Sequence, residues 1–426
     1  MGGGLKQDAT VGTRPARRVM VTGMGCITPY GIGVTPFWEG LVSGRSAISA
    51  LTVFDPAPYS SRIAGEIRDF APRDHMTARE VNGSSRAVQF ALAAARLAVV
   101  DAGLSTPRVD ATRIGVFIGS SVGTFEYAAE NHAVFLEKGI RRVHPLFPAQ
   151  SYGGVVATQL AIALEIRGPA IAVSTACNSA TDAIGLAWMY IRSGVIDRAI
   201  VGGTEAPLTP LLFASFDRLG VMSRDNEVPA RASRPFAKDR DGFVLSEGSA
   251  VCVLEAEDVA RERNVPLLAE VAGYAATSDA FHPFSPHPSG DDAVRAVRDA
   301  LKSADLRVSD VSYVNAHAIG SRTNDPIEAE ILKVVFGEGI QRIPVSAIKS
   351  MIGHTMGAAG ALQLISCVQS LRTSTLPPTI NLNEADRELG LDLVTQTANQ
   401  RIHGVVLSPT FGFGSRNGAV IATHAN

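Results

Sequence analysis

The chain is poor in cysteine, and its cysteines show none of the spacings that mark a metal site or a disulfide framework. Cys26, Cys177, Cys252 and Cys367 are spread through 426 residues, and no CxxC pair occurs. Structural zinc sites and small disulfide-stapled domains both need closely spaced cysteines. We therefore expect no bound metal, and a reduced, cytoplasmic setting for the protein.

Long apolar runs and an excess of charge of one sign are also missing. No run approaches the roughly 20 apolar residues that a membrane-spanning helix needs. Residues 1–17 lack the apolar centre of a secretory signal, so we interpret them as a flexible leader. The formal net charge is −2, which gives no reason to expect nucleic acid or a membrane as a partner.

The composition is that of a globular protein, and the pattern along the chain is that of an α/β protein with two similar parts. It is 46% hydrophobic and 19% charged, and short apolar runs alternate with longer helical patterns. Four landmarks occur twice in the same order: residues 17–31 and 267–280, 113–123 and 311–321, 172–188 and 344–364, and 197–210 and 403–415. This pattern suggests a duplication, with one α/β half over residues 18–265 and a second over 266–426.

Cys177 lies in VSTACNSATDAIG (173–185), between a predicted strand and a predicted helix. A thiol at a helix N-terminus feels the positive end of the helix dipole, which favours the reactive thiolate. A buried structural cysteine fits the same position. The residues around Cys177 alone leave both interpretations open.

Three more side chains follow predicted strands of the second half. His317 follows SYVNA, and both Lys349 and His354 lie in KSMIGHTMGAAG. Neutral imidazoles can stabilise a developing oxyanion. We expect a carboxylate partner for the lysine, with Glu328 and Asp325 as candidates. Structural histidines and a surface lysine are the alternatives.

Five motifs occur together: VSTAC (173–177), RPF with DRDGFV (234–244), VNAH (314–317), KSMIGHTMGAAG (349–360) and FGFGS (411–415). In this order they resemble the β-ketoacyl-acyl-carrier-protein synthases of the elongating type, including the ketosynthase subunits of type II polyketide systems. The resemblance covers nearly the whole chain. It implies a thiolase fold, in which duplicated α/β halves form a five-layer α-β-α-β-α core.

The resemblance also implies a reaction, the decarboxylative condensation of an acyl chain with a malonyl unit. Cys177 is similar to the nucleophile that takes the acyl chain. His317 and His354 are similar to the pair that holds the malonyl thioester. The backbone N–H groups of Cys177 and Phe413 match the oxyanion hole, and Phe413 also matches the gate residue.

Lys349 is similar to the lysine that orders this cluster, with Glu328 as its ion-pair partner and Asp325 as a nearby structural acid. No intrinsic cofactor is implied, because both substrates ride on the phosphopantetheine of an acyl carrier protein. That carrier protein is one expected partner. The other is a second subunit, in a homodimer or in a heterodimer with a chain-length-factor homologue.

Several positions depart from the family's pattern. Residues 318–321, Ala-Ile-Gly-Ser, replace Gly-Thr-(Gly/Ser)-Thr, whose threonines contact the phosphopantetheine arm, and Ser321 stays a candidate contact. Ser415 and Arg416 stand beside the gate, and Asn178 follows the nucleophile where a small residue is usual. We interpret these changes as those of a secondary-metabolite enzyme.

Two residues bear on the depth of the acyl pocket, and three other functions are compatible with parts of the sequence. Val122 aligns with a residue that lines the acyl pocket, and Phe147 with a wall lent by the partner subunit. Three alternative functions remain: a non-condensing chain-length factor, a thiolase-type enzyme acting on coenzyme A esters, and a non-catalytic scaffold. Cys177 argues against the first of these, and His354 in its GHTMGAAG context argues against the second.

Overall fold

The computed structural model describes residues 16–104, 109–382, 389–396, 398–399 and 404–425. Residues 1–15, which make up most of the predicted leader, lie outside this range. Arg17 lies within it, two residues before the first strand, and its side chain forms ion pairs with Asp197 and Asp258. The extent of the leader stays a prediction.

Each half of the chain contributes five long or central strands in the same spatial order. In the N-terminal half the order is β6 (Ala170–Val173), β5 (Ile114–Gly119), β7 (Arg198–Glu205), β8 (Gly248–Ala256) and β1 (Val19–Thr28). In the C-terminal half it is β11 (Pro344–Ser346), β10 (Tyr313–Asn315), β15 (Val405–Gly412), β16 (Arg416–Thr423) and β9 (Ala269–Ser278). Numbered along the chain within each half, both sheets read 3-2-4-5-1.

Strand directions repeat as well. The first three strands of each sheet are parallel, and the last two are antiparallel to their neighbours. The two sheets meet where β1 pairs with β9, at Met20 with Glu270 and Val21 with Ala269. All four pairs of sequence landmarks coincide with equivalent strands, so the predicted duplication is confirmed by the topology.

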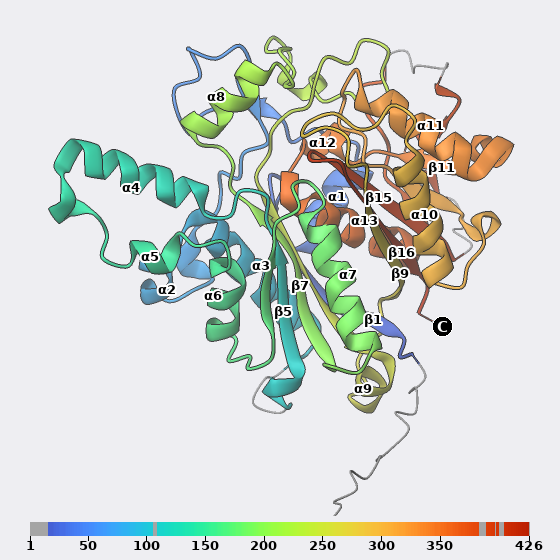
Figure 1. Cartoon of the computed structure of the whole chain (residues 1–426), viewed down its shortest axis with the longest axis horizontal. Coiled ribbons are helices and arrows are strands. Elements are labelled where there is room, and N and C mark those ends of the chain that lie inside the picture. The colour runs from blue at the N-terminus through green and yellow to red at the C-terminus, as the bar shows by residue number, and fades with distance from the viewer. Residues whose placement is uncertain (1–15, 105–108, 383–388, 397, 400–403, 426) are drawn as a thin grey trace, which may run out of the picture.

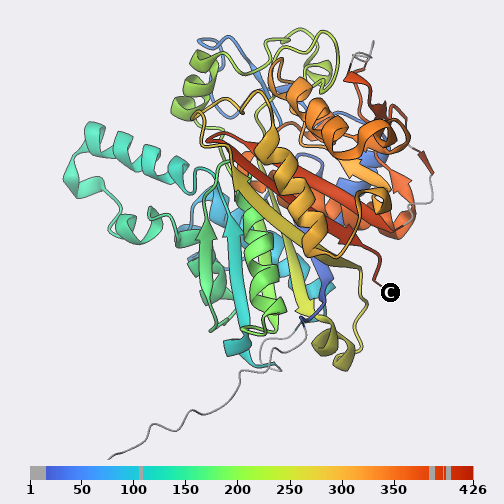
Figure 2. The same ribbon diagram turned by 45° about the vertical axis from the view of Figure 1, so that its right-hand side comes forward.

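Helices form three layers around the two sheets (Figures 1 and 2). The central layer holds α7 (Ser179–Arg192) and α13 (Ala359–Thr373), which contact each other and both sheets. On the outer face of the first sheet lie α3 (Arg86–Asp101) and α6 (Val155–Ala163). On the outer face of the second lie α10 (Asp291–Ser303) and α11 (Asn324–Phe336). The five-layer α-β-α-β-α core is confirmed.

Burial explains why the apolar segments form strands and why the central helices pack closely. Every residue of β1, β7 and β8 is buried, as expected for strands covered by helices on both faces. The central helices approach closely through small residues. A Cβ atom on Gly360 would lie 2.1 Å from Thr181 Oγ1, so glycine lets α13 pack against α7.

The remaining elements lie outside these five layers. The helices are α1 (Val34–Val42), α2 (Ala78–Asn82), α4 (Phe125–Lys138), α5 (Phe147–Gln150), α8 (Pro210–Leu219), α9 (Glu257–Glu262) and α12 (Lys349–Ile352). The strands are β2 (Gly31–Ile32), β3 (Ser49–Ala50), β4 (Ile63–Ala64), β12 (Thr375–Leu376), β13 (Asp392–Leu393) and β14 (Ala398–Asn399). Figure 1 shows α4 and α5 projecting from the body as an arm. The predicted boundary at residues 265–266 falls between α9 and β9 and stays a prediction.

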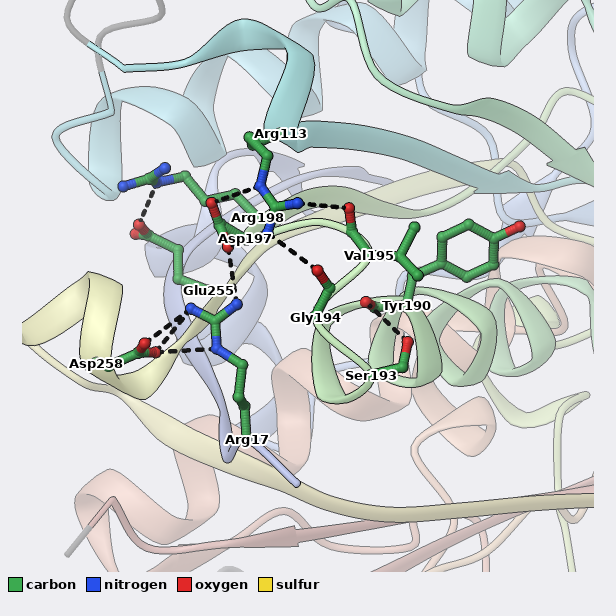
Figure 3. Close-up of polar contacts among 10 residues, drawn as sticks. All are labelled: Arg17, Arg113, Tyr190, Ser193, Gly194, Val195, Asp197, Arg198, Glu255 and Asp258. Carbon is green, nitrogen blue, oxygen red and sulfur yellow. Dashed lines mark hydrogen bonds and ion pairs between the residues drawn. The ribbon is translucent and has the colours of Figure 1, made fainter. Parts of the chain in front are cut away.

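An ion-pair cluster fastens the N-terminal end of the first sheet (Figure 3). Asp197, directly before β7, accepts hydrogen bonds from Arg113, directly before β5, and from Arg17. Arg17 also donates to Asp258 of α9. The starts of three strands are thereby tied together, at the end opposite to the one where the candidate site lies.

Candidate active site

The predicted site residues gather where four strands end. Cys177 follows β6, His317 follows β10, Lys349 follows β11 at the start of α12, and Phe413 follows β15. These strands belong to the parallel part of each sheet, so their carboxyl ends lie at one edge, which is where α/β sheets place ligand sites. His354 lies five residues after Lys349, in the turn before α13.

The turn that carries Cys177 is strained and tightly held. Ala176 has a φ of 53°, a left-handed conformation that residues with a Cβ rarely adopt. Asn178 occupies the N-cap of α7, and its Nδ2 donates to Thr410 O of β15 at 3.1 Å. The nucleophile turn is thus fixed to the strand that leads to Phe413. The sequence alone assigned no role to Asn178.

Cys177 Sγ lies 3.0 Å from His354 Nε2, which joins the two halves of the duplication at one contact. The side chain is 6% exposed, and burial raises the pKa of the thiol to about 11, although the backbone N–H of Phe413 and the charge of Lys349 oppose this. The neutral thiol is therefore the resting form. The sequence led us to expect the thiolate, because the argument counted the helix terminus and not the burial.

Both histidines are buried and neutral. His317 and His354 rings meet edge to face, with centroids 5.5 Å apart. Burial, together with the nearby charge of Lys349, holds the pKa of each well below its usual value. Neither Nδ1 atom has a hydrogen-bond partner among the described residues. A neutral imidazole carries one N–H, so each ring can donate to an oxygen in the cavity.

Lys349 does not make the ion pair that we expected. Its Nζ donates to Gln363 Oε1 of α13 at 2.9 Å, and no ion pair with Glu328 or Asp325 occurs among the described residues. Burial lowers the pKa of Lys349, and the charge of Glu328 opposes that shift. The predicted carboxylate partner is therefore wrong as a contact, and a neutral amide takes its place.

The two carboxylates hold the loop after His317. Glu328 Oε1 accepts from the backbone N–H of His317 at 2.7 Å. The carboxylate of Asp325 accepts from four backbone N–H groups, those of Phe236, Ile319, Gly320 and Ser321. Burial raises the pKa of both groups. Most of their hydrogen bonds are with the backbone that carries the histidine, and the bond from Phe236 ties this loop to residues 234–244.

A largely apolar cavity surrounds the reactive atoms. Its lining residues are Ala176, Cys177, Phe216, Phe243, His317, Ile319, Asn324, His354, Met356, Phe411 and Phe413. A second, more open groove shares four of these, Phe243, Ile319, Asn324 and Phe413, and adds Ser321 and Arg322. The groove therefore lies next to the cavity that Cys177 lines, and Phe413 lines both.

Comparison with known proteins places the chain in a family. The family model described as "Beta-ketoacyl synthase, N-terminal domain" matches residues 16–260, and "Beta-ketoacyl synthase, C-terminal domain" matches residues 268–383. The chain belongs to the β-ketoacyl synthase family.

Relatives and solved structures agree with this placement. This β-ketoacyl synthase is 41% identical to the tetracenomycin polyketide synthase ketoacyl synthase alpha subunit of Streptomyces glaucescens, over 95% of this chain and 96% of that one. It is 36% identical to 3-oxoacyl-[acyl-carrier-protein] synthase 2 of Coxiella burnetii, over 95% and 98%. Among solved structures, the ishigamide ketosynthase/chain length factor matches with a TM-score of 0.90 at 32% identity, over 96% and 100%. The thiolase fold is thereby confirmed.

Two predicted pocket residues lie apart from the cavity lining. Val122 is half-buried in an apolar cluster with Phe216, Met356 and Phe413. Phe147 lies on the arm, in α5, where its ring stacks on Tyr127. Its role as a wall lent to a partner stays a prediction. Ser321 lines the outer groove, and its hydroxyl accepts from the N–H groups of residues 323 and 324.

Three further residues of this β-ketoacyl synthase support the site and were missed from the sequence. Gln363 holds Lys349, and Asn178 holds the nucleophile turn. Glu205, at the end of β7, accepts from Ser120 Oγ and from Gly357 N, three residues after His354. Each is a polar residue inside an otherwise small or apolar run, and that pattern was the available signal.

Within the described ranges, no group of three or more His, Cys, Asp or Glu residues could hold a metal ion. The helices in the same ranges are also too short or too polar to cross a membrane.

Proposed function

We propose that this β-ketoacyl synthase catalyses the decarboxylative condensation of a Cys177-bound acyl chain with a malonyl thioester, giving a β-ketoacyl thioester. The contact between Cys177 Sγ and His354 Nε2, in a cavity that His317 also lines, carries this proposal. Covalent loading splits the condensation into two steps and holds the acyl group where the second substrate reacts.

In the first step the Cys177 sulfur attacks the acyl thioester and displaces the carrier's thiol. The thiol is neutral at rest, so its proton leaves as the bond forms, and His354 Nε2 is the acceptor within reach. Because the pKa of His354 is low, the proton passes on readily to the departing thiolate. The N–H groups of Cys177 and Phe413 point toward the sulfur and stabilise the oxyanion of the tetrahedral intermediate.

In the second step the bond between the malonyl α-carbon and its carboxylate breaks, and CO₂ leaves. The electron pair remains as an enolate, whose oxygen accepts hydrogen bonds from His317 and His354. The enolate carbon then attacks the Cys177 thioester and expels the Cys177 thiolate, which takes up a proton from solvent because its own proton left with the carrier's thiol in the first step. Loss of one such donor in a dry site slows comparable reactions by roughly 100–1,000-fold.

We further propose that both substrates arrive on the phosphopantetheine of an acyl carrier protein, through the groove lined by Ser321 and Arg322. A solved type II polyketide synthase ketosynthase in complex with its acyl carrier protein matches this chain with a TM-score of 0.88 at 30% identity. The resemblance to the tetracenomycin subunit supports a polyketide pathway more than a fatty-acid pathway.

A second subunit completes the proposal. Two structures that match this chain are titled as a ketosynthase with its chain length factor. Among the strands that the structure describes, β6 pairs with β5 alone, and its other edge has no partner strand. An open edge is a ready site for pairing with a second chain. We propose a dimer through this edge, with a second copy or with a chain-length-factor homologue.

Mass spectrometry of Cys177 tests the reaction. We expect acyl-carrier protein to acylate Cys177, and malonyl-carrier protein then to yield a ketoacyl product. The Cys177→Ala variant loses condensation because it has no nucleophile, whereas Cys177→Gln loses transfer and retains malonyl decarboxylation. Absence of an acyl adduct, with and without a co-expressed partner subunit, would contradict the proposal and favour a non-condensing subunit. Turnover of free coenzyme A esters alone would favour a thiolase-type activity.

A further inference from the structure

Gln363 is fully buried in the central helix α13, at the point where three segments of the site converge. Its Oε1 accepts from Lys349 Nζ at 2.9 Å. Its Nε2 lies within hydrogen-bond distance of Asn315 O at 3.1 Å, Pro409 O at 3.2 Å and Ser408 Oγ at 3.3 Å. One side chain therefore connects the start of α12, the end of β10 and the middle of β15.

These three segments carry the reactive groups. Asn315 lies two residues before His317, and Pro409 lies four residues before Phe413. Lys349 begins the segment that leads to His354. The amide of Gln363 thus sets the distances between the histidines, the ammonium group and the oxyanion-hole loop.

The chemistry of an amide matches this position on both sides. Its oxygen accepts the ammonium donor, and its NH₂ group supplies donors to acceptors that include two backbone carbonyls. A carboxylate would present an oxygen to those carbonyls, and an apolar side chain would remove the amide's hydrogen bonds to all of these partners. Buried polar groups without partners are strongly unfavourable.

A neutral partner also leaves the charge of Lys349 uncompensated at this contact. That charge acts on its surroundings, since it helps to keep both histidines neutral and favours the thiolate form of Cys177. The protonation states of Cys177, His317 and His354 therefore depend on where the ammonium group is held and on whether its partner is charged.

We propose that Gln363 is a positioning residue, whose neutral amide fixes the Lys349 ammonium against the end of β10 and the middle of β15 and so sets the electrostatics of the Cys177–His317–His354 cluster. This inference rests on the proposed condensation for its kinetic consequence. Its electrostatic consequence can be measured without that reaction.

Two variants of the full-length protein separate positioning from support of the fold. Gln363→Met keeps the volume and removes every hydrogen bond, so Lys349 loses its proton more easily and the alkaline limb of the kcat profile moves to lower pH. Gln363→Glu places a negative charge beside Lys349, so the same limb moves to higher pH. Gln369→Glu is the matched control, because it makes the same change on the same helix at a residue whose contact is with Arg372.

A second readout needs no condensation. The rate at which iodoacetamide alkylates Cys177, followed by peptide mass spectrometry across pH, reports the pKa of the thiol. Both Gln363 variants reduce the positive potential at the sulfur, so we expect the midpoint to rise by at least about half a pH unit, and Gln369→Glu to leave it unchanged.

The outcomes distinguish the two proposals. A shifted midpoint in a protein that does not condense would retain the positioning role and overturn the proposed function. Folded Gln363 variants, with unchanged melting cooperativity, whose midpoint and alkaline limb both match the wild type would overturn the positioning role. A drop in kcat that is uniform across pH would also overturn it, since a merely structural residue would act in that way.

Discussion

At the scale of single residues, the contacts around Cys177 give Asn178 a physical role. Its Nδ2 bonds the carbonyl of Thr410, and its Oδ1 lies 2.8 Å from the position that a Cβ on Gly412 would occupy. The side chain thus spans the gap between α7 and β15. A side chain on Gly412 would collide with Asn178. Because glycine has none, the nucleophile turn and the Phe413 loop can approach each other closely.

Ser415 connects the Phe413 loop to a neighbouring loop. Its hydroxyl accepts from the N–H groups of Phe281 and His282 and donates to the carbonyl of His282. Phe284 of the same loop meets Phe413 edge to face. Opening the groove by moving Phe413 therefore has to break or carry along these contacts.

We predict losses of stability of different size for two substitutions at Ser415. Its φ is 59°, so Ser415→Gly relieves backbone strain while Ser415→Ala keeps it, and both lose the hydroxyl contacts. We expect Ser415→Ala to lower the free energy of unfolding by about 1–2 kcal/mol, and Ser415→Gly to lower it less. Hydrogen exchange in residues 281–285 should rise in both variants, and protection equal to the wild type would contradict the connection.

The sequence predicted which residues of the site come together, but not how they are held. Cys177, His317 and His354 follow strands in the duplicated pattern, and that pattern is visible in the sequence. The partner of Lys349 was not visible, because Gln363 comes from a helix 14 residues later and reaches Lys349 only after packing. The sequence argument favoured the thiolate because it could not include the burial of the thiol. That burial depends on side chains from the second half of the chain as well as the first.

At the scale of elements, strand order follows from features that repeat along the chain. The landmark pairs predicted both halves, because a buried parallel strand has a continuous apolar run and a turn of small residues at its end. The short strands β12, β13 and β14 were not predicted. Two residues are too few to show any periodicity, and their pairing depends on contacts from distant segments.

Asp197 joins the starts of β1, β5 and β7, and we predict that it stabilises the fold in a pH-dependent way. Hydrogen bonds from Arg113 and Arg17 lower the pKa of Asp197 to about 2. Its contribution is therefore complete above the unfolded value near 4 and is lost as the pH falls towards 2. In urea unfolding, Asp197→Asn should lower the free energy of unfolding by about 1–2 kcal/mol at pH 7, with a smaller difference at pH 3.

A matched control is available in the same cluster. Asp258 also pairs with Arg17, but its side chain is 63% exposed, so Asp258→Asn should change the free energy of unfolding by less than about 0.5 kcal/mol. Equal losses in the two variants, or a loss at Asp197 that does not vary with pH, would show that the pairing of Asp197 with the two arginines is not what stabilises the sheet.

At the scale of the whole molecule, large apolar side chains are exposed along the arm and on α6, next to the open edge strand. Ile140 and Ile162 are 79% and 67% exposed, and α6 packs beside β6. Such surfaces are uncommon on monomers and mark contacts with other chains. The arm extends away from the body (Figure 1) and can reach across a subunit boundary.

We predict that Ile162→Asp weakens the dimer by about ten-fold or more, because it would place a charge in an apolar interface. Sedimentation equilibrium, alone and with a co-expressed chain-length-factor homologue, measures the effect. Val334→Asp is the control, since Val334 is 55% exposed on α11 of the other half. A dimer that is equally stable in both variants would contradict an interface next to β6.

The two edges of the sheet offer different lengths of strand for pairing with another chain. Among the described strands, β6 with four residues forms one edge and β13 with two residues forms the other. A contact between these two different edges would join copies head to tail, which can continue into a fibre. A contact of β6 with β6 of another copy about a two-fold axis is isologous, and it ends growth at two chains because each copy has then used its longer edge.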